Sequence, residues 1–546
     1  MANIFSIGQS ALSAAQAGIS TAGNNIANVS TSGYSRQEVV QTAVAGQPLA
    51  MGYLGQGTKV AEVRRLYNDY LGQQLNSAQS ANQQLQVQYT QIQPLDQMLS
   101  DSTSGLAPAM QDFFNRLQDV ASAPADAVPR QTLLASASAL SANFNEMDNR
   151  LQDLRQGVNQ QLSASVDKVN NAAKQLASLN EAILTANNAS GGVSPNDLLD
   201  QRDQLVRDLS QETRVRVSDQ GGTFSLFLGN GQPLVIGSKV YALKTEASKT
   251  DPQRLEVSYD GSSAPMRAED FGGGNLGGLL QFRDQTLEPT QNALGRIALG
   301  LASAVNAQHQ QGVTLSGDAG GDFFSLPAME VDAASTNQGD ASLEATLSDA
   351  ARLDTSNYRL QRVGDSYRLL RDSDKQVVKS STNLDEVLAA SADAGFALTA
   401  TGTMQSGDEF LIRPSARAAG EIGVAVQDAN AIAAGTTAGA VGDNSNMLKL
   451  AELQSAKVLG GGTQSYQSAY SQLVGQVGSK ASELKVTSTA TAQIQTQAER
   501  SLQDVSGVNL DEEAAKLIRY QQSYQAAGKV IQLAKQLFET VLSISQ

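Results

Sequence analysis

The stretch MANIFSIGQSALSAAQAGISTAGNNIANVSTSGYS, residues 1–35, decides the fold, and the first charged side chain of the chain follows it at Arg36. Large apolar residues recur at every seventh position of this stretch, and a smaller residue follows each of them three positions later. The large residues form an N-terminal packing stripe of Phe5, Leu12, Ile19 and Ile26. This spacing predicts a helix with one apolar face that packs against a second helix.

The other end of the chain carries the matching pattern. Its C-terminal packing stripe has the same sevenfold spacing and consists of Leu517, Tyr524, Ile531 and Phe538. We therefore expect the two ends to pack together in a coiled-coil-like inner layer. Because desolvating an unpaired charge is costly, we expect the uncharged first helix to be buried in a wall and the charged last helix to face water.

Composition narrows the functional classes. The chain has 546 residues, enough for several domains, and its formal net charge is −15 without a basic run, which argues against nucleic-acid binding. It contains no cysteine, which excludes disulfides and thiolate metal sites. Polar residues interrupt every apolar run, so we expect neither a cleaved signal peptide nor a membrane span.

Between the ends, the periodicity changes from helical to strand-like and back. Long helical repeats cover about 71–99 and 133–183, with Pro94 expected to end or kink the first, and alternating residues predict antiparallel strands from about Arg214 onwards. This order predicts a multidomain α+β protein with nested parts. We expect residues 1–35 and 507–546 to form an inner terminal-helix domain, followed by an extended connector at 36–65. A helical rod domain containing a long-helix bundle is expected from 66–212 and 445–506. Inserted into it, we expect a mixed β domain from 213–327 and 415–444, with a helix near 279–310, and an outer β-rich domain at 328–414.

One acidic cluster invites a metal interpretation. In SPNDLLDQRDQLV, Asp197, Asp200 and Asp203 fall on one helical face after a cap expected at Ser194. Carboxylates also favour the start of a helix through its dipole, Arg202 is near, and no histidine accompanies them. We therefore predict no metal site.

Catalysis finds little support in the sequence. The single histidine, His309, lies at the end of a Gln-rich helical stretch, where we expect surface or helix-end packing. Without a second histidine, an HExxH zinc site cannot form. Carboxylate-only catalysis of the glycosidase kind stays open as an alternative, although the chain has no tryptophan to line a sugar cleft. We predict no catalytic residues and no cofactor.

Two motifs carry a resemblance to a known family. NNIANVSTSGYSRQ at 24–37 and VNLDEEAAKLIRYQQSYQAAGKVIQLAKQLFETVLSI at 508–544 resemble the terminal signatures of bacterial flagellar rod, hook and hook-associated axial proteins. Within that set, PNDLLDQRDQLV at 195–206, GGLLQFRD at 277–284 and NAQHQQG at 306–312 are similar to the family of hook-associated protein 1, the hook–filament junction protein. The resemblance covers nearly the whole chain and is weakest over 328–420.

The resemblance implies which residues assemble. The general axial motif and its hook-associated extension are matched by Asn24, Asn25, Asn28, Gly33, Tyr34, Ser35, Arg36 and Gln37. The C-terminal signature is matched by Asn509, Leu510, Asp511, Glu512, Gln521, Tyr524, Ala527 and Lys529. Two positions depart from the family pattern, because Ser32 stands where proline is usual and Gly528 stands where alanine is usual.

The resemblance also implies a function and partners. Such a protein is a structural adaptor, not an enzyme, exported unfolded through the flagellar type III apparatus to the hook–filament junction outside the cell. Its implied partners are further copies of itself in a helical ring, the hook protein, the next hook-associated junction protein, and an export chaperone that covers the C-terminal stripe. The alternatives are a hook or other axial protein, or a surface adhesin acting through the inserted β domains.

Overall fold

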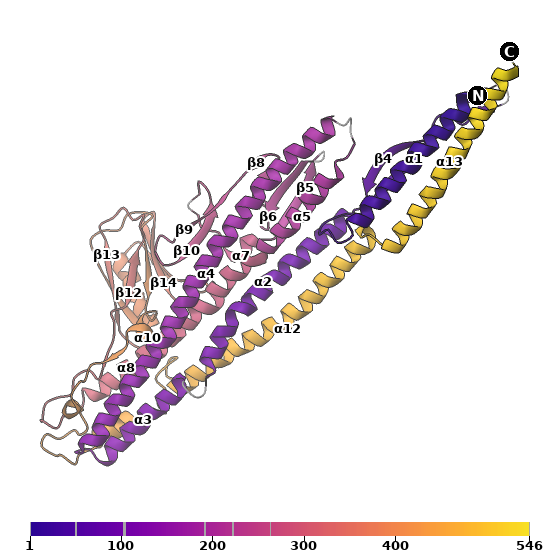
Figure 1. The fold of residues 1–546 in the computed structure, drawn as a ribbon. Coiled ribbons are helices and arrows are strands. Elements are labelled where there is room, and N and C mark those ends of the chain that lie inside the picture. The colour runs from indigo at the N-terminus through magenta and orange to yellow at the C-terminus, as the bar shows by residue number, and fades with distance from the viewer. Residues whose placement is uncertain are drawn as a thin grey trace.

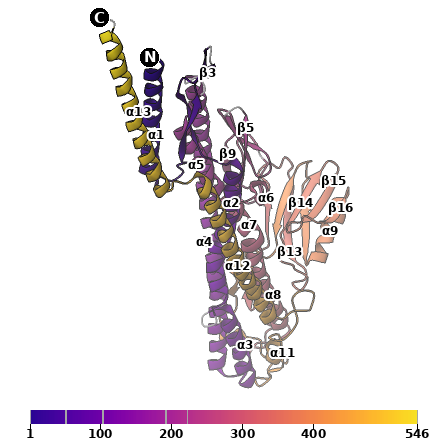
Figure 2. The same ribbon diagram turned by 90° about the vertical axis from the view of Figure 1, so that its right-hand side faces the viewer.

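The computed structural model describes residues 2–49, 52–101, 105–189, 193–220, 223–262 and 264–544. The molecule is elongated. A two-helix arm carries both termini at one end, a helical rod continues from the arm, and β domains lie along the rod (Figure 1). Figure 2 shows that the β domains project from one side of the rod. The predicted multidomain α+β class is confirmed.

The arm consists of α1 (Ala2–Ala27) and α13 (Leu510–Ile544), which lie antiparallel. The segment after α1 forms a hairpin in which β1 (Gln37–Ala43) pairs with β4 (Thr58–Arg65), extended by β2 (Gln47–Leu49) and β3 (Gly52–Leu54). This hairpin folds back along α1, and the backbone N–H of Thr58 donates to Ser10 Oγ at 3.4 Å. The arm therefore has three components, two helices and one hairpin.

The rod is a bundle of long helices. Its helices are α2 (Asp69–Leu99), α3 (Leu106–Ser122), α4 (Ala127–Ala189), α5 (Asn196–Glu212), α7 (Gly274–Phe282), α8 (Glu288–His309), α11 (Ser445–Glu452) and α12 (Tyr466–Ser506). A π-helical turn, Arg283–Leu287, joins α7 to α8. The 63 residues of α4 span roughly 95 Å at 1.5 Å per residue, which sets the length of the rod. Among the described residues, none of these helices combines the length and the apolar character needed to cross a bilayer.

The apolar core contains a group of aromatic side chains at the end of the rod away from the arm. There Phe113 of α3 contacts Phe114, Phe323 and Phe324, with ring centroids 5.4, 6.0 and 5.5 Å away. Towards the arm the rod thins, and α2 and α12 share a small cluster of Leu75, Ala78, Ala498 and Leu502. The arm thus joins the rod next to a small apolar cluster that is separate from the main core.

Three asparagines of α4 attach the first β domain. That domain has a sheet of β5 (Val215–Gln220), β6 (Thr223–Leu228), β7 (Pro233–Ile236) and β8 (Lys239–Val240), a ribbon of β9 (Leu243–Ala247) and β10 (Leu255–Tyr259), and the short α6 (Ala268–Phe271). Asn159, Asn170 and Asn180 each use their side-chain amide to bond backbone groups of these strands and their turns. Their spacing of about three helical turns keeps all three on one face of α4.

The outer β domain contains a five-stranded antiparallel sheet in the order β12-β18-β14-β15-β16. Its strands are β12 (Glu330–Ala333), β14 (Tyr358–Val363), β15 (Ser366–Arg371), β16 (Val377–Ser381) and β18 (Glu409–Arg413), covered by the ribbon of β13 (Ser342–Leu347) with β17 (Phe396–Thr401) and by α9 (Leu384–Ala389). Separately from this sheet, β11 (Phe324–Ser325) pairs with β19 (Gly423–Val424), next to α10 (Ala418–Glu421).

Removal of the outer domain is expected to leave the rod folded. Its first and last strands are neighbours, with Glu330 opposite Arg413, so a short linker can close the gap. Replacing 331–412 with a Gly-Ser linker should leave hydrogen-exchange protection of α4 and α12 within about twofold of the parent. Loss of that protection would show that the outer domain is part of the rod's core.

Three local expectations can be compared with the structure. Of the end or kink expected at Pro94, the end is not found, because Ile92, Leu95 and Leu99 around it are fully buried and their burial offsets the lost backbone bond. Ser194 does not cap α5, which begins at Asn196 after Pro195 without a side-chain cap bond. His309 packs at a helix end, which is one of the two places expected for it, and it is buried there.

Candidate assembly site at the joint of the terminal helices

The contact between α1 and α13 is made by small side chains. The buried positions of α1 are Gly8, Ala14, Ala15, Gly18, Ala22 and Asn25, and those of α13 are Glu513, Ala527 and Ala534. A Cβ built on Gly18 would lie 2.5 Å from Tyr520 Cδ1, and one on Gly8 would lie 2.7 Å from Ile531 Cγ1. The two backbones therefore approach closely, and glycine is needed where a ring or branched side chain crosses.

The predicted packing stripes flank this contact. Leu12, Ile19 and Ile26 are half-buried along its edge, whereas the Phe5 side chain is 48% exposed. On α13, Leu517 and Ile531 are half-buried, while Tyr524 and Phe538 are 41% and 56% exposed. Within one chain, the large residues of the two packing stripes thus bury only part of their apolar surface.

Gly528 of α13 has open space around it, and outside the backbone of its own helix no atom of the described residues lies within 4 Å of a Cβ built there. Gly528→Ala is therefore expected to stabilise α13 by about 1 kcal/mol through helix propensity alone. Hydrogen exchange of residues 524–532 measures this, and faster exchange in the variant would contradict it. Gly8→Ala, on the same helix pair but facing Ile531, provides the contrasting variant.

Asn25 lies at the centre of the joint where the arm meets the rod. Its side chain is 0% exposed. Its Oδ1 accepts from the Tyr34 hydroxyl at 2.7 Å and from the Gln37 N–H at 2.9 Å, while its Nδ2 donates to the Gln37 carbonyl and to Glu513 Oε2, each at 2.9 Å. These contacts use the full hydrogen-bonding capacity of an asparagine amide. One side chain thereby joins α1, the strand β1 and α13.

Arg36 links the same joint to the rod. Its Nε is 2.9 Å from Glu513 Oε1, and its Nη2 is 2.8 Å from Glu512 Oε2. Its backbone N–H donates to the Ser506 carbonyl, and its carbonyl accepts from the Leu66 N–H, both at 2.8 Å. The first charged residue of the chain is therefore the point where the ends of α12, β4 and α13 meet.

The acidic face of α5 holds the connector. Asp200 accepts from the Ser35 N–H at 3.1 Å and pairs with Arg65 at 3.0 Å, and Asp203 pairs with Arg65 at 2.6 Å. Burial, followed by the charge of Asp200, raises the pKa of Tyr34 to about 12, so its hydroxyl keeps its proton. Within the described ranges, no group of three or more histidine or carboxylate side chains is arranged to hold a metal ion.

The remaining motif residues shape the loop between α1 and β1. Asn28 Nδ2 donates to the Asn24 carbonyl at 3.0 Å and to Asn24 Oδ1 at 2.9 Å, which closes the end of α1. Gly33 has a φ of 82°, and a Cβ there would lie 2.8 Å from Gln204 Oε1. Only glycine tolerates both this conformation and this approach to α5. A polar cleft of about 690 Å³ separates this loop from α5 and the end of α12.

Glu513 should make the joint sensitive to acid. Its burial alone would raise its pKa, but hydrogen bonds from Asn25 and Lys516 and the charge of Arg36 hold the pKa below the ordinary value of 4.5. Its stabilising effect is then present above about pH 4.5 and is lost as pH falls through the lower folded pKa. We expect hydrogen exchange at residues 20–27, corrected for the intrinsic rate, to accelerate below pH 4 in the parent and to show little pH dependence in Glu513→Gln.

Sequence reasoning found the motif but missed its partners. Arg65, Asp200 and Asp203 were not linked to it, because no spacing rule connects positions so far apart in the chain. Glu513 carried a usable signal, since it lies seven residues before Tyr520 and so shares the register of the buried Ala527 and Ala534. A charge in a buried register predicts a bonded partner across the contact.

Comparisons with known proteins agree with this architecture. Family models match residues 92–324 as the flagellar hook-associated protein FlgK helical domain and 332–414 as the D2-like domain of flagellar hook-associated protein 1. Residues 5–34 match the flagella basal body rod protein model, and 503–544 match the flagellar basal body rod FlgEFG protein C-terminal model.

Full-length relatives are also known. The chain is 37% identical to flagellar hook-associated protein 1 of Escherichia coli (strain K12) and 36% identical to that of Salmonella typhimurium, with 100% of both chains covered in each case. The solved flagellar hook junction protein FlgK of Burkholderia pseudomallei is 29% identical with a TM-score of 0.73, covering 80% of this chain and 100% of that one. The chain belongs to the flagellar hook-associated protein 1 family.

Proposed function

We propose that this protein is a structural adaptor of the bacterial flagellum that assembles on the distal end of the hook and joins the hook to the filament. The observation that carries the proposal is the arm, which leaves apolar side chains exposed along α13 and at the start of α1. They include Ile4, Phe5, Ile518, Tyr524, Leu533, Leu537, Phe538 and Val541. A surface of this kind favours contact with further copies of the chain in a helical ring.

The ends of this adaptor would serve different neighbours. Ring contacts on one side fit the hook protein, and those on the other accept the next hook-associated junction protein. The relatives carry hook-associated names, which supports this placement on the flagellum, outside the cell. Beyond the joint, the charged positions Arg519, Lys529, Lys535 and Glu539 of α13 are exposed, as expected for a helix beside a water-filled lumen, whereas Glu513 is buried and Lys516 is half-buried.

Export precedes assembly in this proposal. The chain passes unfolded through the flagellar type III apparatus, and an export chaperone covers the C-terminal stripe until then. The exposure of Tyr524 and Phe538 supports the need for such a cover, because an exposed apolar helix face promotes aggregation. Phe538→Ser is accordingly the variant with which to measure loss of chaperone binding.

The proposed function involves no catalysis. The relatives are named as structural parts of the flagellum, which supports a protein without enzymatic activity. Both ring nitrogens of the only histidine, His309, bond the backbone: Nδ1 donates to the Gly321 carbonyl at 2.7 Å and Nε2 accepts from the Ala433 N–H at 2.9 Å. Burial lowers the pKa of His309, in keeping with a neutral ring.

We also propose the domain division given by the sequence patterns. In it, the arm and the 36–65 connector assemble, the rod domain transmits load, and the strands of the inserted β domains at 213–327 with 415–444 and at 328–414 lie outermost, while α7 and α8 of the first inserted domain pack in the rod. The terminal helices lie at one end of the rod and the outer sheet projects from its side, which supports this order (Figure 2).

A label locates the protein directly. An epitope inserted at the exposed Gly364 turn between β14 and β15, in cells lacking their own copy, should mark one band at the hook–filament boundary in electron micrographs. The restored motility of those cells serves as the control for assembly. Label along the entire hook or filament would contradict the junction assignment and favour another axial protein.

A further inference from the structure

The outer β domain is connected to the rod by a narrow neck. The chain enters it at Glu330 of β12 and leaves it at Arg413 of β18, and these two residues face each other in the sheet. Two adjacent strands carry the whole covalent connection. The neck is charged, since Arg413 Nη2 is 2.8 Å from Glu330 Oε1 and 2.7 Å from Asp332 Oδ2, and Arg417 Nη2 is 2.7 Å from Glu330 Oε1.

A single carboxylate of the first β domain, that of Asp251, contacts this neck. Asp251 follows β9, is 4% exposed, and lies between two arginines. Its Oδ2 pairs with Arg155 of α4 and lies 3.3 Å from Arg413 Nη1. The Nε atoms of both arginines are buried without a hydrogen-bond partner, so each guanidinium depends on its Nη contacts. Asp251 therefore joins the rod to the neck through one oxygen atom.

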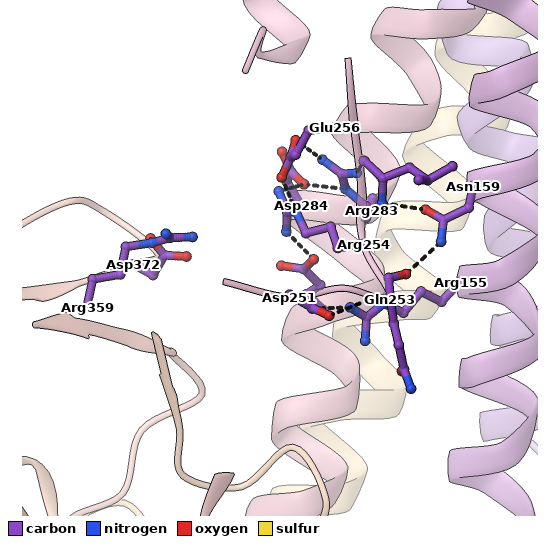
Figure 3. A network of polar contacts seen from close by, with 12 residues as sticks. Arg155, Asn159, Asp251, Gln253, Arg254, Glu256, Arg283, Asp284, Arg359 and Asp372 are labelled. Atoms are coloured by element: carbon purple, nitrogen blue, oxygen red, sulfur yellow. Dashed lines mark hydrogen bonds and ion pairs between the residues drawn. The ribbon is translucent and has the colours of Figure 1, made fainter. Parts of the chain in front are cut away.

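Beside Asp251, two charged clusters face each other without bonding. On the rod side, Arg254 pairs with Glu256, Asp284 and Glu288, and its Nη2 is 3.0 Å from Asp284 Oδ1. On the outer side, Arg359 pairs with Asp372 at 2.8 Å and with Glu409. Both clusters line a polar gap of about 20 Å³, and Figure 3 shows Arg359 and Asp372 standing apart from the Arg254 cluster.

The other polar contacts between the outer domain and the body are single hydrogen bonds of the described residues. From α8, Asn292 donates to the Thr355 carbonyl at 3.1 Å and to Asn357 Oδ1 at 3.0 Å, and Arg296 Nη1 donates to the Leu353 carbonyl at 3.4 Å. Elsewhere, the Ser335 N–H donates to the Lys249 carbonyl at 2.9 Å and the Gly461 N–H donates to the Ala351 carbonyl at 2.7 Å. Single hydrogen bonds of this kind break and re-form at little net cost. A two-strand neck beside such contacts favours rotation, since a small set of terminal residues can absorb it.

From this arrangement we propose that the outer domain rocks as a rigid body on its two-strand neck, and that Asp251, held between Arg155 and Arg413, is the pivot that fixes its resting angle. The pivot sets orientation and leaves the folds on either side intact. Rocking in one direction closes the polar gap and brings Arg359 towards the carboxylates around Arg254. This inference does not depend on the function proposed above.

Spin-label distances test the pivot in the full-length protein. The chain has no cysteine, so Lys174→Cys on α4 and Ser380→Cys on β16, both exposed, place labels on the two bodies without background. Asp251→Asn and, separately, Arg413→Met are expected to broaden the distance distribution at least twofold. The matched control is Asp374→Asn, which breaks an Asp–Arg pair with Arg371 inside the outer domain and should leave the width unchanged.

Hydrogen exchange of β14 and α4 accompanies each measurement. Protection equal to the parent, together with a broadened distribution, supports a pivot. A width equal to that of the control in both variants overturns the proposal. Loss of protection in β14 would also overturn it, because Asp251 would then be part of the fold of the outer domain. Asp251→Asn removes the carboxylate that both arginines contact, whereas Arg413→Met keeps the Arg155–Asp251 pair and removes the contact with the neck.

Discussion

Asn25→Asp is expected to separate α13 from α1 at the joint of the arm. The substitution keeps the shape of the side chain but replaces two N–H donors with a carboxylate, 2.9 Å from the carboxylate of Glu513 and from the carbonyl of Gln37. Both acidic groups would be buried, and an uncompensated buried charge costs about 3–5 kcal/mol. Hydrogen exchange of residues 18–27 should therefore accelerate by roughly two orders of magnitude or more.

The neighbouring asparagine is the control. Asn24 is exposed and its side chain bonds Asn28 within the same helix, so Asn24→Asp adds the same charge one position away at little cost. Equal acceleration in the two variants would show that charge on α1 acts through helix stability and not through the joint. Cells carrying Asn25→Asp should also lose motility, whereas Asn24→Asp should retain it.

A double variant separates repulsion from lost bonds. Combining Asn25→Asp with Glu513→Gln restores a donor opposite the new carboxylate, so part of the loss should return, while Glu513→Gln alone weakens the ion pairs to Arg36 and Lys516. The coupling between the two substitutions should reach about 1–3 kcal/mol, as for groups in direct contact. Additive losses would mean that Asn25 and Glu513 act on different parts of the joint.

The arm also shows how far the sequence could predict the structure. Sevenfold spacing identified both helices and their mutual packing, because local periodicity is written in consecutive residues. The pattern predicted alternating large and small residues in the contact, and the structure buries the small ones, such as Ala15 and Ala22, more deeply than the large ones, since two helices with small faces gain more contact by close approach.

The polar joint was less predictable. The NNIAN motif marked Asn25, but its bonds to Gln37 and Glu513 depend on how a connector of some thirty residues folds back along α1. Of the end or kink expected at Pro94, the end does not occur, since tertiary burial outweighs the cost of proline inside a helix. Long-range pairs such as Arg65 with Asp203 have no local signature, so only the folded chain reveals them.

Gly18→Val is expected to force the two arm helices apart. The added Cβ would lie 2.5–2.7 Å from three atoms of the Tyr520 ring, and rotation about χ1 does not move the Cβ away from the ring. Gly18 has helical backbone angles, so the penalty is steric, and overpacking of this kind costs about 1–3 kcal/mol. Hydrogen exchange of residues 12–22 should accelerate about tenfold or more.

Gly23→Ala is the matched control, because Gly23 lies on the same helix and a Cβ built there would have no atom of another described element within 4 Å. It should slow exchange through the higher helix propensity of alanine, by about 1 kcal/mol.

Gly18→Ala gains the same propensity and meets the ring, so the difference between the two alanine variants measures the steric term alone. Tyr520→Ala should rescue Gly18→Ala if the ring is the obstacle. Equal protection in Gly18→Ala and Gly23→Ala would mean that the helices are not in close contact at Gly18, and the small-residue seam would then not be what holds the two ends of the chain together.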